Sequence, residues 1–293
     1  MGIKFRLIVM NFLQYAIWGS WLISLGAYLG GGLDFTGLQI GSFFATMGVA
    51  SLFMPAVMGI IADRWIPAQK LLGICHLVSG GFLIAAASQT AYGPLYSCML
   101  LSVMFYMPTI ALSNSVAYNA LDLARLDTVK HFPPIRVWGT VGFIAAMWFV
   151  DLTHIGGVQI KLTEWQLYVS AVLSFLLAVY SFSLPGCPVD RNVKARSWVD
   201  TLGLRAFTLF KEKRMAIFFV FSMLLGAALQ ITNAFGDSYI QSFGSMPQYA
   251  DSAIVKHSVI LLSLSQMSET FCILLIPFFL RRFGIKKVML ISM

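Results

Sequence analysis

The chain has 293 residues, of which 58% are hydrophobic and only 11% are charged, and its mean hydropathy is +0.80. A soluble domain is only about half apolar, so this composition excludes an ordinary soluble protein and predicts a membrane protein. The net charge of +8 would suit a nucleic-acid partner, but the basic residues lie in the connections between apolar segments. We therefore expect no nucleic-acid partner.

Eight apolar stretches are long enough to cross a bilayer, which takes about 20 helical residues. They lie near residues 5–30, 38–62, 71–89, 94–120, 133–152, 165–185, 215–243 and 253–280. The first stretch lacks the cleavage site of a secretory signal, so we expect it to remain as a helix. A ninth apolar run opens at Val288 and stops at Met293, so we expect the sequence to be a piece of a longer chain.

These stretches predict an all-α, polytopic membrane protein with eight complete transmembrane helices. Six of them precede residue 186, and the only long polar connection follows. We therefore expect an N-terminal six-helix bundle over residues 1–186 and a cytoplasmic linker over 187–213. The start of a second bundle would then occupy residues 214–293.

The basic residues predict the orientation. With the N-terminus in the cytoplasm, nearly all of the 20 Lys and Arg residues fall on the cytoplasmic side, whereas Lys161 and Lys256 fall outside and Arg136 lies in a helix. Positively charged loops are retained in the cytoplasm. We expect a lipid-embedded, multi-pass protein of the cytoplasmic (inner) membrane, with its N-terminus inside.

The sequence carries no pattern typical of an enzyme or a metalloprotein. The four cysteines fit neither a disulfide framework nor a metal site, and no Gly-rich Walker motif with its Lys is present. No His-rich metal set, and no nucleophile with a base and an orienting partner, stands out. We therefore expect no catalytic residues, no metal and no cofactor.

The stretch GIIADRWIPAQK, residues 59–70, resembles the cytoplasmic loop motif of the major facilitator superfamily. The matching residues are Gly59, Asp63, Arg64 and Lys70. An acid at the cytoplasmic end of a helix can pair with an arginine or face the positive end of another helix, and such contacts favour one conformation of a rocking transporter. We expect Asp63 and Arg64 to act as a conformational gate.

Polar side chains occur well inside two of the late helices, although a charged group there costs roughly 2.5 to 3.5 kcal/mol. The seventh helix carries Gln230, Asn233 and Asp237, and the eighth carries Gln266 and Glu269. Residues three, four or seven apart share one face of a helix. The two faces therefore present amides and carboxylates that can converge on one site.

Glu269 lies about ten residues, or about 15 Å, from the cytoplasmic end of its helix, near the middle of the bilayer. One interpretation is a substrate ligand or a proton carrier, since desolvation favours the protonated form of a carboxyl group. The other is a buried acid that pairs for structural reasons, for example with Arg136. The amides have a structural alternative too, because amides often join helices in membranes.

The fifth helix opens with HFPPIRVWGTVGF, in which Pro133 and Pro134 suit a helix N-terminus. Arg136, Thr140 and Phe143 follow on one stripe. Arg136 lies so close to the predicted helix start that its position alone favours a side chain that snorkels to the cytoplasm. The stripe that it shares with Thr140 and Phe143 favours the alternative, a role in a cavity. The first bundle offers further polar candidates that could line a cavity, although we favour packing for each of them: Gln14, Trp18 and Asn114.

Three strings together are similar to the bacterial nucleoside permeases of the nucleoside:proton symporter family, within the major facilitator superfamily. They are FPPIRVWGTVGF (132–143), KRMAIFFVFSMLLGAALQITNAFG (213–236) and SLSQMSETFCILLIPFFLRRFGIKKVM (263–289). The resemblance implies two six-helix bundles and proton-driven nucleoside uptake. It also implies a set of residues around the nucleoside: Arg136, Thr140, Phe143, Gln230, Asn233, Gln266 and Glu269. The chain departs from some relatives at Ala228, where they carry an acid.

The function that this resemblance implies is import of purine and pyrimidine nucleosides by a proton-coupled secondary transporter. A single site would be exposed to each side in turn, Glu269 would be the candidate for proton coupling, and we expect a monomer. Two alternatives remain open. A sugar or polyol symporter of the same superfamily would use the same amides, and a membrane sensor would bind without transporting.

Overall fold

The computed structural model describes residues 2–189, 209–249 and 252–291. Its helices are α1 (Ile3–Gly19), α2 (Leu25–Ala27), α3 (Gly37–Arg64), α4 (Ala68–Ala87), α5 (Tyr92–Leu123), α6 (Thr128–Leu152), α7 (Trp165–Ser181), α9 (Lys213–Ser242), α10 (Ala253–Lys256) and α11 (Ser258–Ile291). Short turns of other helix types are η1 (Tyr28–Gly32), η2 (Ile160–Leu162) and η4 (Phe243–Ser245). A two-residue pair, β1 (His154–Ile155) and β2 (Val158–Gln159), forms a small antiparallel hairpin.

The all-α prediction is confirmed. By length and composition, six of the helices in the described ranges are apolar enough to cross a membrane: Gly37–Arg64, Ala68–Ala87, Tyr92–Leu123, Thr128–Leu152, Lys213–Ser245 and Ser258–Leu275. The other two predicted spans have a different form. The first is α1 followed by α2 and η1, and the sixth is the shorter apolar helix α7.

The prediction that Pro133 and Pro134 begin the fifth helix is wrong. Helix α6 begins at Thr128, because the Asp127 carboxylate accepts a hydrogen bond from the Val129 amide at 2.9 Å and caps the helix. Both prolines lie inside the helix. Arg136 therefore lies eight residues beyond the start of α6, about 12 Å along its axis, which is deeper than the sequence suggested.

The end of the chain also differs from the prediction. Within α11 the backbone turns sharply at Gly284, where φ is 72° and ψ is 161°, a conformation that glycine adopts at little cost. The helical segment after this kink begins ahead of the apolar run at Val288. At the other end, the predicted span over 253–280 is divided at His257, which separates α10 from α11.

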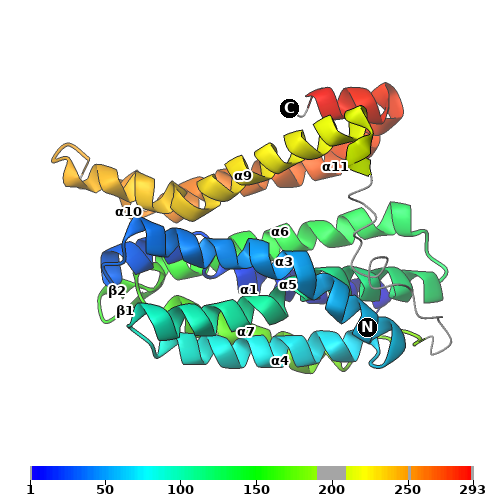
Figure 1. Cartoon of the computed structure of the whole chain (residues 1–293), viewed down its shortest axis with the longest axis horizontal. Coiled ribbons are helices and arrows are strands. Elements are labelled where there is room, and N and C mark those ends of the chain that lie inside the picture. The colour runs from blue at the N-terminus through cyan, green and yellow to red at the C-terminus, as the bar shows by residue number, and fades with distance from the viewer. Residues whose placement is uncertain (1, 190–208, 250–251, 292–293) are drawn as a thin grey trace.

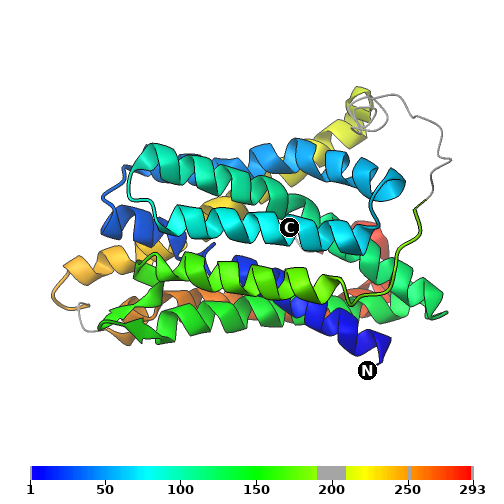
Figure 2. The same ribbon diagram turned by 90° about the horizontal axis from the view of Figure 1, so that it is seen from below.

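The helices form two groups (Figure 1). In the first group α1 packs against α6 and α7, α4 packs against α5 and α7, and α3 packs against α5. Figure 2 shows this group from below, with its helices lying side by side along the long axis. The second group, α9 and α11, lies along one side of the first and diverges from it toward the end where the C-terminus lies (Figure 1). The apolar core is contributed mainly by the first group.

Helices α1 and α6 touch through their backbones. A Cβ atom added to Gly142 would lie 2.2 Å from the Phe12 carbonyl oxygen, and one added to Gly19 would lie 2.4 Å from the Phe143 carbonyl oxygen. A larger residue at either position would push the two helices apart. This close approach places the Arg136, Thr140 and Phe143 stripe of α6 directly beside α1.

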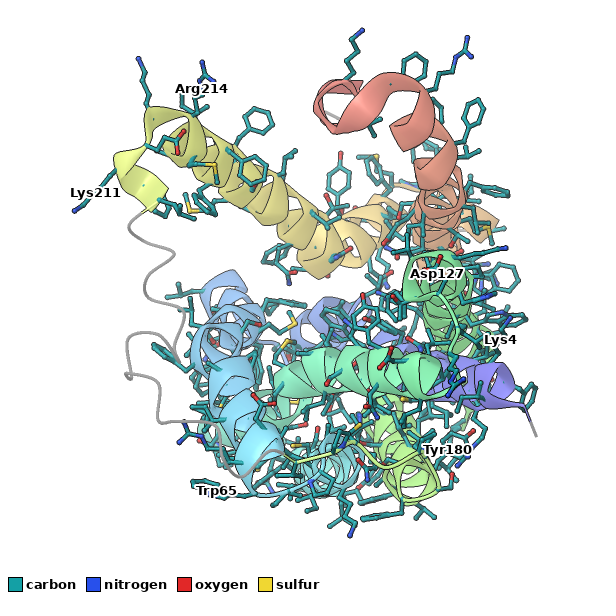
Figure 3. All side chains as sticks on the ribbon, turned by 90° about the vertical axis from the view of Figure 1, so that its right-hand side faces the viewer. Lys4, Trp65, Asp127, Tyr180, Lys211 and Arg214 are labelled. Carbon is teal, nitrogen blue, oxygen red and sulfur yellow. The ribbon has the colours of Figure 1, made fainter. Side chains whose placement is uncertain are left out.

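The two groups meet toward the end that carries the hairpin and α10. A Cβ atom on Gly26 would lie 2.6 Å from the Ala234 carbonyl oxygen, and the Trp148 indole donates to Ser263 Oγ at 2.9 Å. The only buried residues of α9 are Ala234 and Asp237, both in its second half. The first half of α9 is exposed and lies apart from the first group (Figures 1 and 3).

The predicted linker, residues 187–213, lies largely outside the described residues, because 190–208 are not part of them. What the structure does describe is the position of its far end. Lys211 and Arg214, at the start of α9, lie well away from Trp65 and Tyr180 of the first group (Figure 3). The segment that joins the two groups therefore begins and ends on the side where they are separated.

Candidate functional site

A cavity of about 170 Å³ lies between the two groups, and four helices line it. The lining residues are Tyr15 and Trp18 of α1, Leu22 of the turn that follows α1, Arg136, Thr140 and Phe143 of α6, Leu229 and Asn233 of α9, and Gln266 and Glu269 of α11. Six of the seven residues that the sequence placed around a ligand therefore share one cavity. Polar groups come from both helix groups.

Arg136 turns toward α1. Its guanidinium lies 3.8 Å from the centre of the Tyr15 ring, a cation–π contact that holds the charge over an aromatic face. Gly139 makes room for this pair, since a Cβ atom there would lie 2.6 Å from Tyr15 Cδ2 and 2.8 Å from Arg136 Nη1. The side chain is thus fixed at the cavity wall.

Trp18 stands between aromatic side chains of two other helices. Its ring centre is 5.9 Å from that of Tyr106 and 6.5 Å from that of Phe143, the latter in an edge-to-face arrangement. Phe143 and Thr140 are buried at 6% and 5% exposure. These contacts leave the Trp18 and Phe143 rings little freedom, so the apolar part of the cavity wall is preformed.

A fully satisfied hydrogen-bond network supports this wall from inside the first group. The Gln14 amide donates to Thr109 Oγ1 at 2.7 Å, and its oxygen lies 2.8 Å from His76 Nε2. Because that oxygen can only accept, His76 donates through Nε2. The Tyr106 hydroxyl donates to the Gln14 carbonyl at 2.7 Å, and Ser174 donates to the His76 carbonyl at 2.8 Å.

The second group contributes Asn233, Gln266 and Glu269. The two amides are partly buried, whereas Glu269 is exposed. Arg136 and Glu269 both lie close enough to Tyr15 to act electrostatically on its hydroxyl. No ion pair joins Arg136 to Glu269 in the described part of the chain, so the two opposite charges face the same cavity without neutralising each other directly.

Gln230 lies outside this cavity. It lines a second cavity of about 560 Å³ between α3 and α9, together with Trp18, Met47, Met107 and Phe235 among others. Trp18 lines both cavities. The indole is therefore the shared wall between the smaller, more polar cavity and the larger, more apolar one.

Three buried hydrogen-bond donors at these cavities have no partner among the described residues. They are Trp18 Nε1, Arg136 Nη1 and Gln230 Nε2. A buried donor without a partner costs about 1 to 3 kcal/mol, so native proteins satisfy nearly all of them. All three groups donate, and the arrangement therefore suits a ligand that offers several acceptor atoms.

The predicted gate residues lie away from this site. Asp63 is exposed and Arg64 partly exposed at the C-terminal end of α3. That end is next to Trp65, on the side where the two helix groups are separated (Figure 3). Asp63 makes no ion pair within the described ranges, and those ranges also contain no cluster of His, Cys, Asp and Glu that suits a metal ion.

Sequence reasoning weighed Trp18 as a cavity residue but favoured packing, and it missed Tyr15 and Leu22. Tyr15, Trp18 and Leu22 stand at i, i+3 and i+7 and so occupy one face of the first span. Trp18 was interpreted as packing, and it does pack, but its indole N–H also points into a cavity edge without a partner. The aromatic stripe was the available signal. Gln14, by contrast, is packing, because its side chain is satisfied by Thr109 and His76.

Comparison with known proteins assigns the family. The family model for nucleoside H+ symporters matches residues 1–293. The chain belongs to this family. It is therefore a transporter and not an enzyme, as the sequence predicted.

Curated relatives agree with this assignment. The chain is 53% identical to the xanthosine permease of Escherichia coli K12 over 293 residues, all of this chain and 69% of that protein. It is 48% identical to the nucleoside permease NupG of the same organism over 292 residues, again 69% of the relative. The putative nucleoside transporter YegT is 34% identical over 291 residues, 64% of its length.

Solved structures agree as well. A crystal structure of a mutant of the nucleoside transporter NupG matches 99% of this chain and 71% of that one, with a TM-score of 0.90 at 48% identity. A second NupG crystal structure gives a TM-score of 0.86. The predicted major-facilitator-type architecture is therefore confirmed for this nucleoside H+ symporter family member.

Proposed function

We propose that this protein imports nucleosides together with protons and that the nucleoside binds in the cavity between the two helix groups. The observation that carries the proposal is the set of buried donors without partners, Trp18 Nε1, Arg136 Nη1 and Gln230 Nε2. A nucleoside offers base carbonyls, ring nitrogens and ribose oxygens as acceptors. Binding it would satisfy groups that are otherwise buried at a cost.

The rest of the cavity suits the other parts of a nucleoside. Asn233 and Gln266 each offer a donor and an acceptor, which can match the edge of a base or a pair of ribose hydroxyls. Phe143 and Trp18 offer aromatic surface to a flat ring. Glu269 can accept a hydrogen bond from a hydroxyl. The cavity of about 170 Å³ is below the usual range of ligand pockets, roughly 300 to 1,000 Å³, so we propose that the ligand also enters the neighbouring cavity.

Glu269 is the proposed proton carrier. It is the acid that lines the cavity, and it faces Arg136 across that cavity without an ion pair in the described structure. A carboxyl group that meets the ligand can gain or lose a proton as the site opens to either side of the membrane. That would link proton binding and nucleoside binding at one place.

The proposed orientation places the N-terminus in the cytoplasm of a bacterial inner membrane. Positively charged connections then lie on the cytoplasmic side, and so does the side on which α9 is separated from the first group (Figure 1). The hairpin and α10 are outside. In this orientation the described conformation is closed toward the outside and open toward the cytoplasm, and Asp63 and Arg64 lie at the open side as candidate gate residues.

Uptake in proteoliposomes or whole cells tests the function. Accumulation of radiolabelled uridine by the intact transporter should collapse when a protonophore removes the proton gradient. Uptake that the protonophore leaves undiminished would exclude proton symport and leave a facilitator. Cells with the empty vector give the background that must be subtracted.

Competition distinguishes nucleosides from sugars and polyols. Excess adenosine should abolish uridine uptake, and excess free ribose should leave it unchanged, because the unpartnered donors suit acceptors of a base as well as ribose oxygens. The opposite pattern would indicate a sugar site. A membrane sensor would bind uridine without accumulating it inside the vesicles.

A further inference from the structure

Polar side chains from both helix groups meet at the end that carries the hairpin and α10. We call Asp151, Lys161, Asp237, His257 and Ser258 the end cluster. Asp151, Asp237 and Ser258 are completely buried, and Lys161 is 1% exposed. Charged residues are almost never fully buried unless they are paired. The charged members of the end cluster are therefore expected to pair with one another where the two helix groups meet.

The Lys161 ammonium is the centre of the end cluster. Its nitrogen lies 2.6 Å from Asp151 Oδ1, 2.9 Å from the Lys256 carbonyl oxygen and 3.2 Å from Ser258 Oγ. The ammonium therefore makes one ion pair and two hydrogen bonds. One partner, Asp151, belongs to α6 of the first group. The other two lie at the end of α10 and at the start of α11.

The remaining bonds extend this connection. Ser258 donates to Asp237 Oδ1, and Gln241 donates to Asp237 Oδ2 at 3.0 Å. His257 Nδ1 lies 2.7 Å from Asp151 Oδ2, and because a carboxylate only accepts, Nδ1 carries the proton. Asp151 is thus held between Lys161 of its own group and His257 of the other group.

The charges of the end cluster balance only with an additional proton. Two carboxylates face a single ammonium, which leaves one buried negative charge, and a buried charge without compensation is costly. The side chain of His257 is 36% exposed, so it is the member that solvent can reach. An imidazole can carry one further proton, and a protonated His257 beside Asp151 would neutralise the end cluster.

Other titratable groups lie in the surrounding segments but have different surroundings. His154 of the hairpin is exposed, and its Nδ1 lies 3.0 Å from the Leu152 carbonyl oxygen. Glu164, ahead of α7, is partly buried. Lys256 enters the end cluster through its main-chain carbonyl. The charges that act on Asp237 are those of Lys161 and Asp151.

We propose that the end cluster is a proton-operated latch between the two helix groups. A proton taken up by His257 from the outer solution closes the latch and favours the conformation that is open to the cytoplasm. Loss of this proton leaves a buried negative charge and favours opening to the outside. The proposal rests on the proposed function for its orientation, and it assigns proton binding at the gate to a place separate from Glu269.

Accessibility of a cysteine behind the latch tests the proposal. The probe cysteine replaces Ser238, which is partly buried on α9 and faces Gly26 of α2. The four native cysteines, Cys75, Cys98, Cys187 and Cys272, are replaced by alanine. A membrane-impermeant methanethiosulfonate is added to right-side-out vesicles without nucleoside, and rates are divided by those of an exposed cysteine at Gln248 to correct for thiol ionisation.

We expect the relative labelling rate to rise about fivefold or more between about pH 5.5 and about pH 8. His257→Gln should remove this dependence and leave the rate at its high-pH value at every pH. His154→Gln is the matched control, since it removes the other histidine at this end, and it should behave like the parent. A His257→Gln variant that keeps the parent's pH dependence would overturn the proposal.

A second pair of variants tests the latch without relying on histidine. Lys161→Met should raise the labelling rate about tenfold at low pH, because it leaves two carboxylates buried together. Combining it with Asp151→Asn should bring the rate back to within about threefold of the parent, since both charges of the pair are then gone. If Lys161→Met alone is labelled at the parent's rate at low pH, the result contradicts the latch.

If Lys161→Met does not fold, the double variant and the histidine comparison still decide the question. No nucleoside is present in these measurements, so their outcome does not depend on transport. A protein that failed the protonophore test could still show the pH-dependent labelling, and a normal symporter could lack it. The two proposals therefore fail separately.

Discussion

The cavity and the network behind it are two adjacent sets of buried polar groups with opposite properties. In the network, Gln14, His76, Tyr106 and Thr109 satisfy one another within a single helix group. At the cavities, Trp18, Arg136 and Gln230 each keep a buried donor without a partner in the described structure. The network needs nothing from outside the chain, whereas we propose that a ligand completes the cavity. Substitutions in the two regions should therefore affect stability and binding in opposite ways.

The largest expected effect concerns coupling at Glu269. Glu269→Gln keeps the shape of the side chain and removes its charge, so uridine should still equilibrate but should no longer accumulate. One coupled charge is worth about 2.3 kcal/mol per 100 mV, or about fiftyfold in accumulation. The steady-state ratio of internal to external uridine measures this directly.

Glu164→Gln is the control for that variant, because Glu164 lies outside the cavity and ahead of α7. It should leave accumulation unchanged. If Glu269→Gln binds uridine normally and still accumulates it against a gradient, Glu269 is not the coupling acid.

Arg136→Met should weaken binding without weakening the fold. Losing a hydrogen bond to a charged group costs about 2 kcal/mol, which is about thirtyfold in Kd. The melting temperature should stay the same or rise, since an unpartnered buried donor disappears. Titration calorimetry and thermal unfolding in detergent measure the two quantities, and Tyr15→Phe, which keeps the ring beneath the guanidinium, is the control. Arg136→Lys then shows whether the forked geometry matters beyond the charge.

Gln14→Met should have the reverse effect. It leaves His76 and Thr109 without a shared partner in a fully buried network, at a cost of about 1 to 3 kcal/mol for each group left unsatisfied. The melting temperature should fall by several degrees, and the Kd for uridine should change by less than about threefold, because Gln14 does not line the cavity. A variant with normal stability and poor binding would show that the network is part of the site.

Spacing along helices predicted much of this arrangement. The stripes Arg136–Thr140–Phe143 and Gln266–Glu269 each face one cavity, because i, i+3, i+4 and i+7 positions share a face whatever the surroundings. Helix ends were predicted less well. Two prolines suggested that α6 starts near residue 133, but Asp127 caps the helix earlier. Arg136 therefore lies farther from the start of the helix than the prolines suggested, which disfavours a side chain that snorkels to the cytoplasm.

What spacing could not predict is which stripes meet. Gln230 and Asn233 lie on one face of α9, yet they line different cavities because Trp18 of α1 stands between them. The contact depends on Gly19 and Gly142, which let α1 and α6 touch, and nothing in the periodicity of either helix specifies that pairing. The same holds for Lys161, a charge in the connection between α6 and α7 that is buried by contacts with α6, α10 and α11.

The smallest expected effect on uridine binding concerns Gln230, the unpartnered donor of the larger cavity. Its amide faces the larger cavity, beyond Trp18, so it contributes only if the ligand reaches past the indole. Gln230→Leu removes one unpartnered donor and should weaken uridine binding by about 1 kcal/mol, or about fivefold in Kd, with no loss of thermal stability. Leu229→Ala, on the smaller cavity, is the apolar control. An unchanged Kd would confine the ligand to the cavity of about 170 Å³, and the donor of Gln230 would then need another partner to explain why it is buried.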